Sequence, residues 1–447
     1  MRRLLWASTF LVFCLLESSA HSGRARKALR RVSAIQKTLS RIRELPFKKN
    51  VRASRQSKKA FVRYLESEIA KEISPQKRAD HDKALVHLGF LRDGKELVPA
   101  TRELLAAQTF AYYDTKRKRF FLVDLADEDL RFDVVIAHEI QHALQDQHFD
   151  LRAFYEDRAP SLTRDERLAR QFIVEGEATF LMAAFMLSSQ ENSPRLSSER
   201  GAFVVQEMRE LAALKLETLA GLSNPASPEQ GTRHQNTQEV IAATPLFVLG
   251  PLLAAYTKGV LPVADAFERG RWDEVNQLFE NPPESTEQVL HPAKLVGERD
   301  KPMTVFFTKP NEILDWRLLD SDVMGEFLWK MYFGEWEVEN FENTAKGWGG
   351  DRYAVFEDKK GRVAGIFLTK WDSNLAAFEF CADYVRTLKK RFPGSVITKG
   401  AGEARMVRRS DGTVLWMGRK QNSVLILDGF TTRSPEAFAK LAAFVTQ

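Results

Sequence analysis

Apolar residues recur along this chain in two different patterns, and the change falls near residue 315. Before it, most segments repeat apolar positions every three or four residues, which predicts amphipathic and buried helices. Beyond residue 350, short apolar runs alternate with tight turns such as Asp411-Gly412, which predicts antiparallel strands. The chain is therefore predicted to be an α+β protein. Its mainly helical first domain carries a small β-hairpin, and a small antiparallel α+β C-terminal domain follows. In that second domain, Trp316 to Phe333 is predicted to be helical, and Ser434-Pro435 is predicted to begin the last helix.

The helical part has clear internal boundaries. Residues 24–45 form a predicted basic amphipathic helix that ends near Pro46. Its apolar face consists of Ala28, Val32, Ile35, Leu39 and Ile42. Residues 57–108 predict further helices with a break at Ile73-Ser74-Pro75. Two strand-like runs between Phe110 and Val123, separated by a polar turn, predict a hairpin.

One apolar helix, Val134 to Leu144, carries polar groups that packing does not explain. His138 and His142 are four residues apart, so both imidazoles project from one helical face. Two imidazoles at this spacing can bind one Zn²⁺ at about 2.0–2.1 Å each. Glu139 lies beside them, placed for a metal-held water rather than for the metal. This is the H-E-x-x-H arrangement of two ligands and a general base.

A catalytic zinc needs a third protein ligand, and the apolar segment Phe172 to Met182 offers two acids. Glu175 and Glu177 are two residues apart, so they face different directions and one of them is expected to reach the metal. Glu175 is the better candidate. Gly176 between them lacks a side chain, which suits a point where two helices approach closely.

With these residues the chain resembles the gluzincin metallopeptidases, which combine H-E-x-x-H with a glutamate ligand on a later helix. Val174 to Ala178 matches the E-G-x-A part of their N-E-G-x-A segment, so the resemblance selects Glu175. It implies that His138, His142 and Glu175 bind zinc. The linker from His142 to Glu175 is longer than in typical gluzincins, and Thr179 stands where some members have an aspartate.

A wider resemblance is to uncharacterised bacterial proteins that read H-E-x-x-H-A-L-Q-D-Q-H-F-D-L. This chain has that motif from His138 to Leu151, and the accompanying segments Ser285 to Pro292 and Gly347 to Tyr353. The resemblance covers most of the mature chain and implies no substrate. The glycine-rich start of the last segment, residues 347–350, is predicted to be a turn. Its glycines lack the phosphate-loop pattern, so nucleotide binding is rejected.

Several residues are candidates for supporting roles. Peptide hydrolysis needs a donor for the developing oxyanion. His291 is a candidate transition-state stabiliser, with Tyr155 and Tyr256 as alternatives, although His291 also fits a structural role before Pro292. Asp146, four residues beyond His142, is predicted to orient that imidazole. His148 is off the ligand face and is not expected to bind metal.

The hairpin before the zinc helix has two interpretations. In gluzincins the corresponding strand borders the cleft, and a substrate peptide pairs along its free edge. Such β-augmentation recognises main chain with little regard to sequence. An ordinary core hairpin explains the same residues equally well.

Charge separates an N-terminal arm from the body. The chain's net +6 divides into +1 for residues 1–20, +13 for residues 21–60 and −8 for the remainder. The arm is interpreted as docking on the acidic body, with a peripheral contact to anionic membrane or a removable pro-segment as alternatives. Nucleic acid is not an expected partner, because the protein is predicted to be exported.

Export is predicted from the first residues. Arg2-Arg3, the apolar run Leu4 to Leu16 and the small residues Ser18 to Ala20 are typical of a signal peptide cleaved near Ala20. Cys14 is then lost and Cys381 is the one remaining thiol. The predicted organisation is a signal peptide (1–20), a basic helical arm (21–60), a gluzincin-like domain (61–300) and the C-terminal α+β domain (315–447).

Together these features predict an exported zinc metallopeptidase acting on peptide or protein substrates, in the periplasm or outside the cell. Two alternatives remain open. The first is a non-catalytic scaffold or binding protein that retains a zinc site, and the second is a metallohydrolase acting on a non-peptide amide or ester. Glu139 argues against the scaffold, because a structural zinc needs no base and is usually closed by four ligands.

Overall fold

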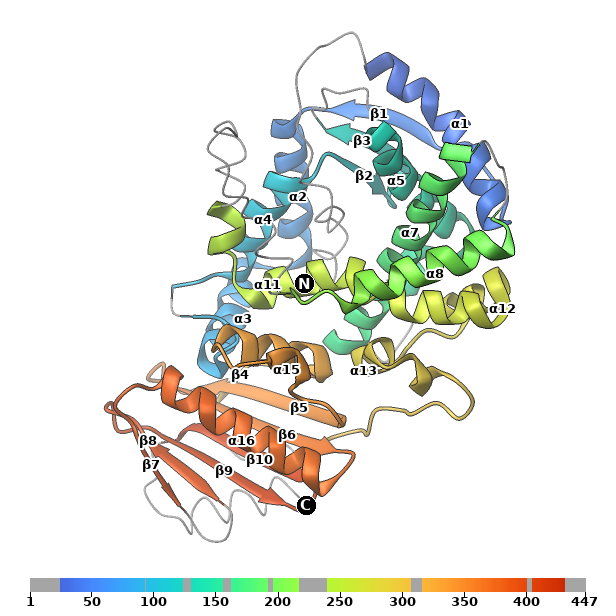
Figure 1. Cartoon of the computed structure of the whole chain (residues 1–447). Coiled ribbons are helices and arrows are strands. Elements are labelled where there is room, and N and C mark those ends of the chain that lie inside the picture. Colours follow the sequence, from blue (N-terminus) through green and yellow to red (C-terminus); the bar gives the residue numbers. More distant parts are fainter. Residues whose placement is uncertain are drawn as a thin grey trace, which may run out of the picture.

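The computed structural model describes residues 25–92, 94–123, 130–155, 162–191, 196–216, 239–306, 316–399 and 404–430 (Figure 1). The predicted signal peptide and the helix predicted to begin at Ser434 lie outside these residues. Helices dominate the first three hundred residues, and an antiparallel sheet follows them. The predicted α+β class is therefore confirmed.

The basic arm forms α1 (Ala25–Arg43), as its amphipathic pattern predicted. Val32, Ile35, Leu39 and Ile42 are all buried. Their face packs on α5 (Leu130–Phe149) and α7 (Arg164–Glu191), the two helices that carry the candidate metal ligands (Figure 1). The arm thus docks on the body, and its apolar face is turned to the core.

The next helices are α2 (Lys58–Glu72), α3 (Pro75–Leu88) and α4 (Leu97–Gln108), and α3 begins at the predicted break. Ser74 caps it by accepting a hydrogen bond from the backbone N–H of Lys77. The hairpin is confirmed as β2 (Ala111–Asp114) and β3 (Arg119–Val123). β1 (Arg52–Gln56) pairs parallel with β3 and was not predicted, because its polar sequence carries no strand pattern. The order β1-β3-β2 leaves β2 at an edge.

The remaining helices surround α5 and α7. They are α6 (Leu151–Tyr155), α8 (Ser198–Ala213), α11 (Leu246–Thr257), α12 (Val260–Glu280), α13 (Thr286–Leu290) and η2 (Pro292–Leu295). Gly176 on α7 lies against the junction of α11 and α12, where a Cβ atom would fall 2.0 Å from the carbonyl oxygen of Gly259. The close helix approach predicted at Gly176 is therefore present.

One helical stretch among the described residues, Leu246–Glu280, is long and apolar enough to cross a membrane. It is 83% buried inside the protein over its most apolar window. Its apolar side chains pack on α7, α8 and α15 (Gly325–Glu335), so the apolar sequence is explained by a place in the core.

The C-terminal region is a sheet in the order β4-β5-β6-β10-β9-β8-β7, with every neighbouring pair antiparallel. α16 (Asn374–Arg391) packs across β6, β10 and β9 (Figure 1). The strands are β4 (Arg317–Asp322), β5 (Trp348–Glu357), β6 (Val363–Trp371), β7 (Val396–Lys399), β8 (Arg405–Arg408), β9 (Val414–Lys420) and β10 (Ser423–Phe430); η3 (Phe341–Asn343) precedes β5.

Two predictions in this region were wrong. Trp316 to Phe333 was predicted as one helix, but it forms β4 and then α15, divided at Gly325, whose φ is +77°. The glycine-rich segment at residues 347–350 was predicted as a turn, but Trp348 already begins β5. Gly350 is needed there because a Cβ atom would lie 2.2 Å from the carbonyl oxygen of Met303.

Candidate metal centre

The helix α5 brings three polar side chains into the core together. His138, Glu139 and His142 are 2%, 0% and 6% exposed. The two imidazole rings lie on one face, as their spacing predicted, with centroids 4.9 Å apart and planes nearly perpendicular. Burying three such groups is costly unless each has a partner. The contacts of these three side chains with neighbouring elements therefore indicate the function of this helix.

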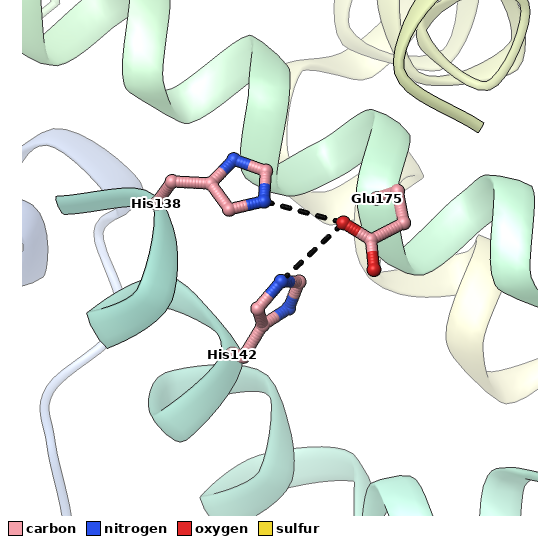
Figure 2. Close-up of side chains that lie close together, drawn as sticks. All are labelled: His138, His142 and Glu175. Carbon is pink, nitrogen blue, oxygen red and sulfur yellow. Dashed lines mark hydrogen bonds and ion pairs between the residues drawn. The ribbon is translucent and has the colours of Figure 1, made fainter. Parts of the chain in front are cut away.

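Glu175 on α7 meets both histidines (Figure 2). Its Oε2 lies 3.2 Å from Nε2 of His138 and 3.4 Å from Nε2 of His142. One ligand atom from each of the three residues lies within 4.8 Å of the others. Two ligands about 2.1 Å from a tetrahedral ion stand roughly 3.4 Å apart, so these spacings suit a metal. The three residues form a buried group that could hold a metal ion.

The electrostatics of the group favour a cation. Burial lowers the pKa of His142, but the charge of Glu175 outweighs it, and the pKa stands at about 9. Burial raises the pKa of Glu175, but the charge of His142 and hydrogen bonds from both histidines bring it down to about 2. Glu175 is thus a carboxylate that holds positive charge beside it in a dry site.

Glu139, the neighbour of His138 on α5, is buried beside this group without being one of its three candidate ligands. Its Oε2 accepts a hydrogen bond from the backbone N–H of Tyr113, at 3.0 Å, while its Oε1 has no partner among the described residues. Burial raises the pKa of Glu139 to about 8, and the charge of Glu175 adds to this. A buried carboxyl with one free oxygen and a raised pKa is suited to taking up a proton. Tyr113 belongs to β2, so the edge strand reaches the site.

The partner of the His142 ring is not the predicted one. Asp146 was predicted to orient it, but Asp146 instead accepts hydrogen bonds from Lys118 Nζ, at 2.7 Å, and from the hydroxyl of Tyr113, at 2.8 Å. Gln145 holds the imidazole, with its Oε1 2.8 Å from Nδ1 of His142. Gln145 is three residues from His142 and so lies on the same face of the helix; this spacing in the sequence could have indicated it as the partner.

Glu177 stays out of the group, as its two-residue offset from Glu175 predicted. It is fully buried and pairs with Arg43 at the end of α1. Thr179, which stands where some gluzincins have an aspartate, is buried, and its hydroxyl has no hydrogen-bond partner among the described residues. Second contacts to the ligands therefore come from α5 and not from Thr179.

The three candidate stabilisers have different positions. The Tyr256 ring lies against that of His138, with centroids 5.5 Å apart. Burial raises the pKa of the Tyr155 phenol well above its usual value, and the charge of Glu175 adds to this. His291 has Nε2 at 3.0 and 3.1 Å from the carboxylate oxygens of Glu326 on α15. Tyr256 is thus in ring contact with a candidate ligand, whereas His291 pairs with Glu326.

The accompanying motif segments join the two halves of the molecule. In the first, Thr286 donates a hydrogen bond to Asp165 on α7, at 2.5 Å. In the second, Asp351 accepts hydrogen bonds from the indole N–H groups of Trp348 and Trp329, at 2.8 and 3.1 Å, and from the backbone of α15. Both segments therefore fix α7 and α15 in place.

Comparison with known proteins reaches only the C-terminal region. Residues 316–438 match a family model described as a domain of unknown function (DUF8575). No curated protein matches the chain, and no solved structure matches it. The matched residues lie within the predicted C-terminal domain and exclude the ligand group, so the gluzincin resemblance stays a prediction.

Proposed function

We propose that this protein is an exported zinc-dependent metallopeptidase. The observation that carries the proposal is the meeting of His138, His142 and Glu175 in one buried group, with Glu139 beside it. Two imidazoles and one carboxylate are a common ligand set of catalytic zinc, which keeps a fourth position open. The predicted signal peptide supplies the location, outside the cytoplasm.

The protein's own residues would divide the work as follows. His138, His142 and Glu175 hold the ion, and a bound zinc ion lowers the pKa of a coordinated water toward about 7 and polarises a carbonyl. The free Oε1 of Glu139 receives the proton of the attacking water and returns it to the leaving amine. Tyr256, whose ring lies against that of His138, and Tyr155 are the candidate hydroxyl donors to the developing oxyanion.

A peptide is the substrate we favour because of β2. This strand is at the edge of its sheet, and its Tyr113 N–H points to Glu139. An extended peptide could pair along such an edge by main-chain hydrogen bonds, which would bring a scissile bond near the base. The alternative hydrolase, acting on a non-peptide amide or ester, would have no use for this edge.

The test is hydrolysis of an unfolded protein by the zinc-loaded chain. Glu139→Gln keeps the size of the side chain but removes the base, so the rate should fall about 10²–10⁴-fold while bound zinc stays unchanged. Glu274→Gln, at an exposed position on α12, is the matched control and should keep full activity. Equal rates for Glu139→Gln and the wild type would refute the peptidase, and activity on esters alone would support the alternative hydrolase.

A further inference from the structure

A line of buried side chains connects the N-terminal arm to a metal ligand. Arg43, in the last turn of α1, places Nε 2.5 Å from Oε1 of Glu177, and the two side chains are 1% and 0% exposed. The second oxygen of Glu177 accepts a hydrogen bond from Nε2 of Gln145. The Gln145 oxygen in turn lies 2.8 Å from Nδ1 of His142. Residues from α1, α7 and α5 thus form one chain of contacts.

The donors and acceptors in this chain allow one arrangement. A guanidinium only donates, and the carboxylate it pairs with only accepts. The Gln145 nitrogen faces two acceptors, Glu177 and the carbonyl of Val174 at 2.9 Å, so the amide oxygen must face His142. Nδ1 of His142 therefore carries the hydrogen. Its Nε2, 3.4 Å from Oε2 of Glu175, is then the nitrogen whose proton a metal would replace.

Arg43 is itself fixed from the other side by α12. Its Nη2 donates to Oδ1 of Asn276 at 2.6 Å, and its guanidinium lies 4.6 Å from the ring centroid of Trp272. The indole N–H of Trp272 donates to the carbonyl of Ile42, at 2.7 Å. The end of the arm is therefore built into the core, with hydrogen bonds to both backbone and side chains.

We infer that Arg43 is a positioning residue of the metal centre, acting through Glu177 and Gln145 to set the tautomer of His142. The arm is then a permanent part of the centre and not a removable pro-segment. This inference rests on the proposed metal site. Outer-shell partners of a metal-binding histidine are typically worth about 10–100-fold in metal affinity, so the effect is large enough to measure.

Deleting a single charge is the weaker test of the inference, because one unpaired buried charge can prevent folding. The double variant Arg43→Met/Glu177→Met removes both charges and keeps the volume filled, which is often neutral for stability. Gln145 then loses one of its two acceptors and keeps only the Val174 carbonyl to orient its amide. Arg41→Met, exposed on the same helix, is the control.

The experiment uses the full chain and measures zinc affinity by competition with a chelator, together with the visible absorption spectrum of the Co²⁺-loaded protein. We expect the double variant to bind zinc about 10–100-fold more weakly and to give an altered cobalt spectrum. Arg41→Met should match the wild type in both. Glu177→Gln, which keeps the size of the side chain, should lower the affinity about tenfold and decides the matter if the double variant does not fold.

The outcomes separate the inference from the proposed function. Unchanged zinc affinity and cobalt spectrum in a folded double variant, or in Glu177→Gln if it alone folds, would overturn the inference and leave the metal site intact. A wild type that binds no zinc would overturn both. A wild type that binds zinc, loses affinity as expected and hydrolyses nothing would overturn only the proposed peptidase.

Discussion

Two groups of three metal-ligand side chains occur in the described part of the chain, and they differ in what lies between them. The first is His138, His142 and Glu175, and the second is Glu287, Asp300 and Asp372. In the second group Nζ of Lys294 lies 2.7, 2.6 and 3.0 Å from the three carboxylates. The lysine already supplies the positive charge that a metal would otherwise provide. We therefore interpret this group as a structural ion-pair network that connects the segments carrying Glu287, Asp300 and Asp372.

In the first group the positive charge lies on one of the candidate ligands, the imidazole of His142, whose pKa is raised to about 9 beside Glu175. Nε2 of His142 faces only a long contact of 3.4 Å to Glu175 in the described hydrogen bonds and ion pairs, and Oε1 of the neighbouring Glu139 has no hydrogen-bond partner among the described residues. Buried polar atoms are almost always paired, so the open carboxylate oxygen beside the ligand group indicates a site for something else. Proximity of His, Asp and Glu side chains alone therefore does not identify a metal site. Their other hydrogen bonds and ion pairs distinguish a metal site from an ion-pair network.

The largest expected difference between the two groups is the loss of stability when metal is removed from His138, His142 and Glu175. An ion that binds only the folded chain, at a thousand times its dissociation constant, stabilises the chain by about 4 kcal/mol. A strong chelator should therefore lower the free energy of unfolding in urea by a similar amount. Glu175→Ala should show no chelator effect, because its site is incomplete. Identical wild-type curves with and without chelator would contradict the account.

The second prediction contrasts two buried histidines. Burial, with Arg391 and Arg409 nearby, lowers the pKa of His87 from 6.5 to about 4, although Asp428 opposes this. The unfolded chain then takes up a proton that the folded chain refuses between pH 6.5 and 4. Stability should fall across that window as pH drops, by roughly 1.4 kcal/mol per unit at most. His142, whose pKa is raised, adds nothing to this loss.

The contribution of His87 is checked by urea unfolding at several pH values. The variant His87→Gln cannot titrate, so its stability should depend less steeply on pH than that of the wild type over the same window. Superimposable pH profiles for the two proteins would show that His87 ionises as freely in the folded chain as in the unfolded one.

The third prediction concerns the helix crossing that places Glu175. A methyl group at residue 176 would meet the backbone of Gly259, so Gly176→Ala must push α7 away from the α11–α12 junction. Overpacking of this kind costs about 1–3 kcal/mol. We expect lower stability in urea together with weaker zinc binding. A destabilised variant with unchanged zinc affinity would show that the crossing does not position the ligand.

The smallest effect is expected at the lysine-centred group. Lys294→Met leaves three carboxylates without their cation, but two of them, Asp300 and Asp372, are exposed, so solvent screens the repulsion. The loss of stability should be about 1 kcal/mol. Zinc content should not change, because the two groups are independent. Loss of zinc from Lys294→Met would show that the ion-pair network around Lys294 supports the metal centre.

The sequence predicted much of the fold because apolar periodicity reports burial directly. The helices from α1 to α4, the hairpin and most C-terminal strands follow it. β1 was missed because its residues Arg52 to Gln56 are polar, and its pairing with β3 is a long-range contact. The division of Trp316 to Phe333 into β4 and α15 depends on pairing with β5 and on the backbone of Gly325, which no local pattern shows.

The ligand group was predicted residue by residue, and its supporting contacts were not. Spacing on a helix fixes which face His138 and His142 share, so their meeting could be foreseen. The choice between Gln145 and Asp146 depends on where α7 and β2 lie, because Glu177 engages the amide while Tyr113 engages the carboxylate. Arg43 lies 134 residues from Glu177 in sequence, and only the packing of α1 brings them together.

The most direct test of the account is the zinc content of the purified mature protein, measured per chain for the wild type, Glu175→Ala and His148→Ala. His148 is on α5 but bonds to the carbonyl of Pro46 and lies outside the ligand group, so it is the matched histidine control. The account predicts about one zinc in the wild type and in His148→Ala, and none in Glu175→Ala. A wild type without zinc, even after zinc is added back, would contradict it.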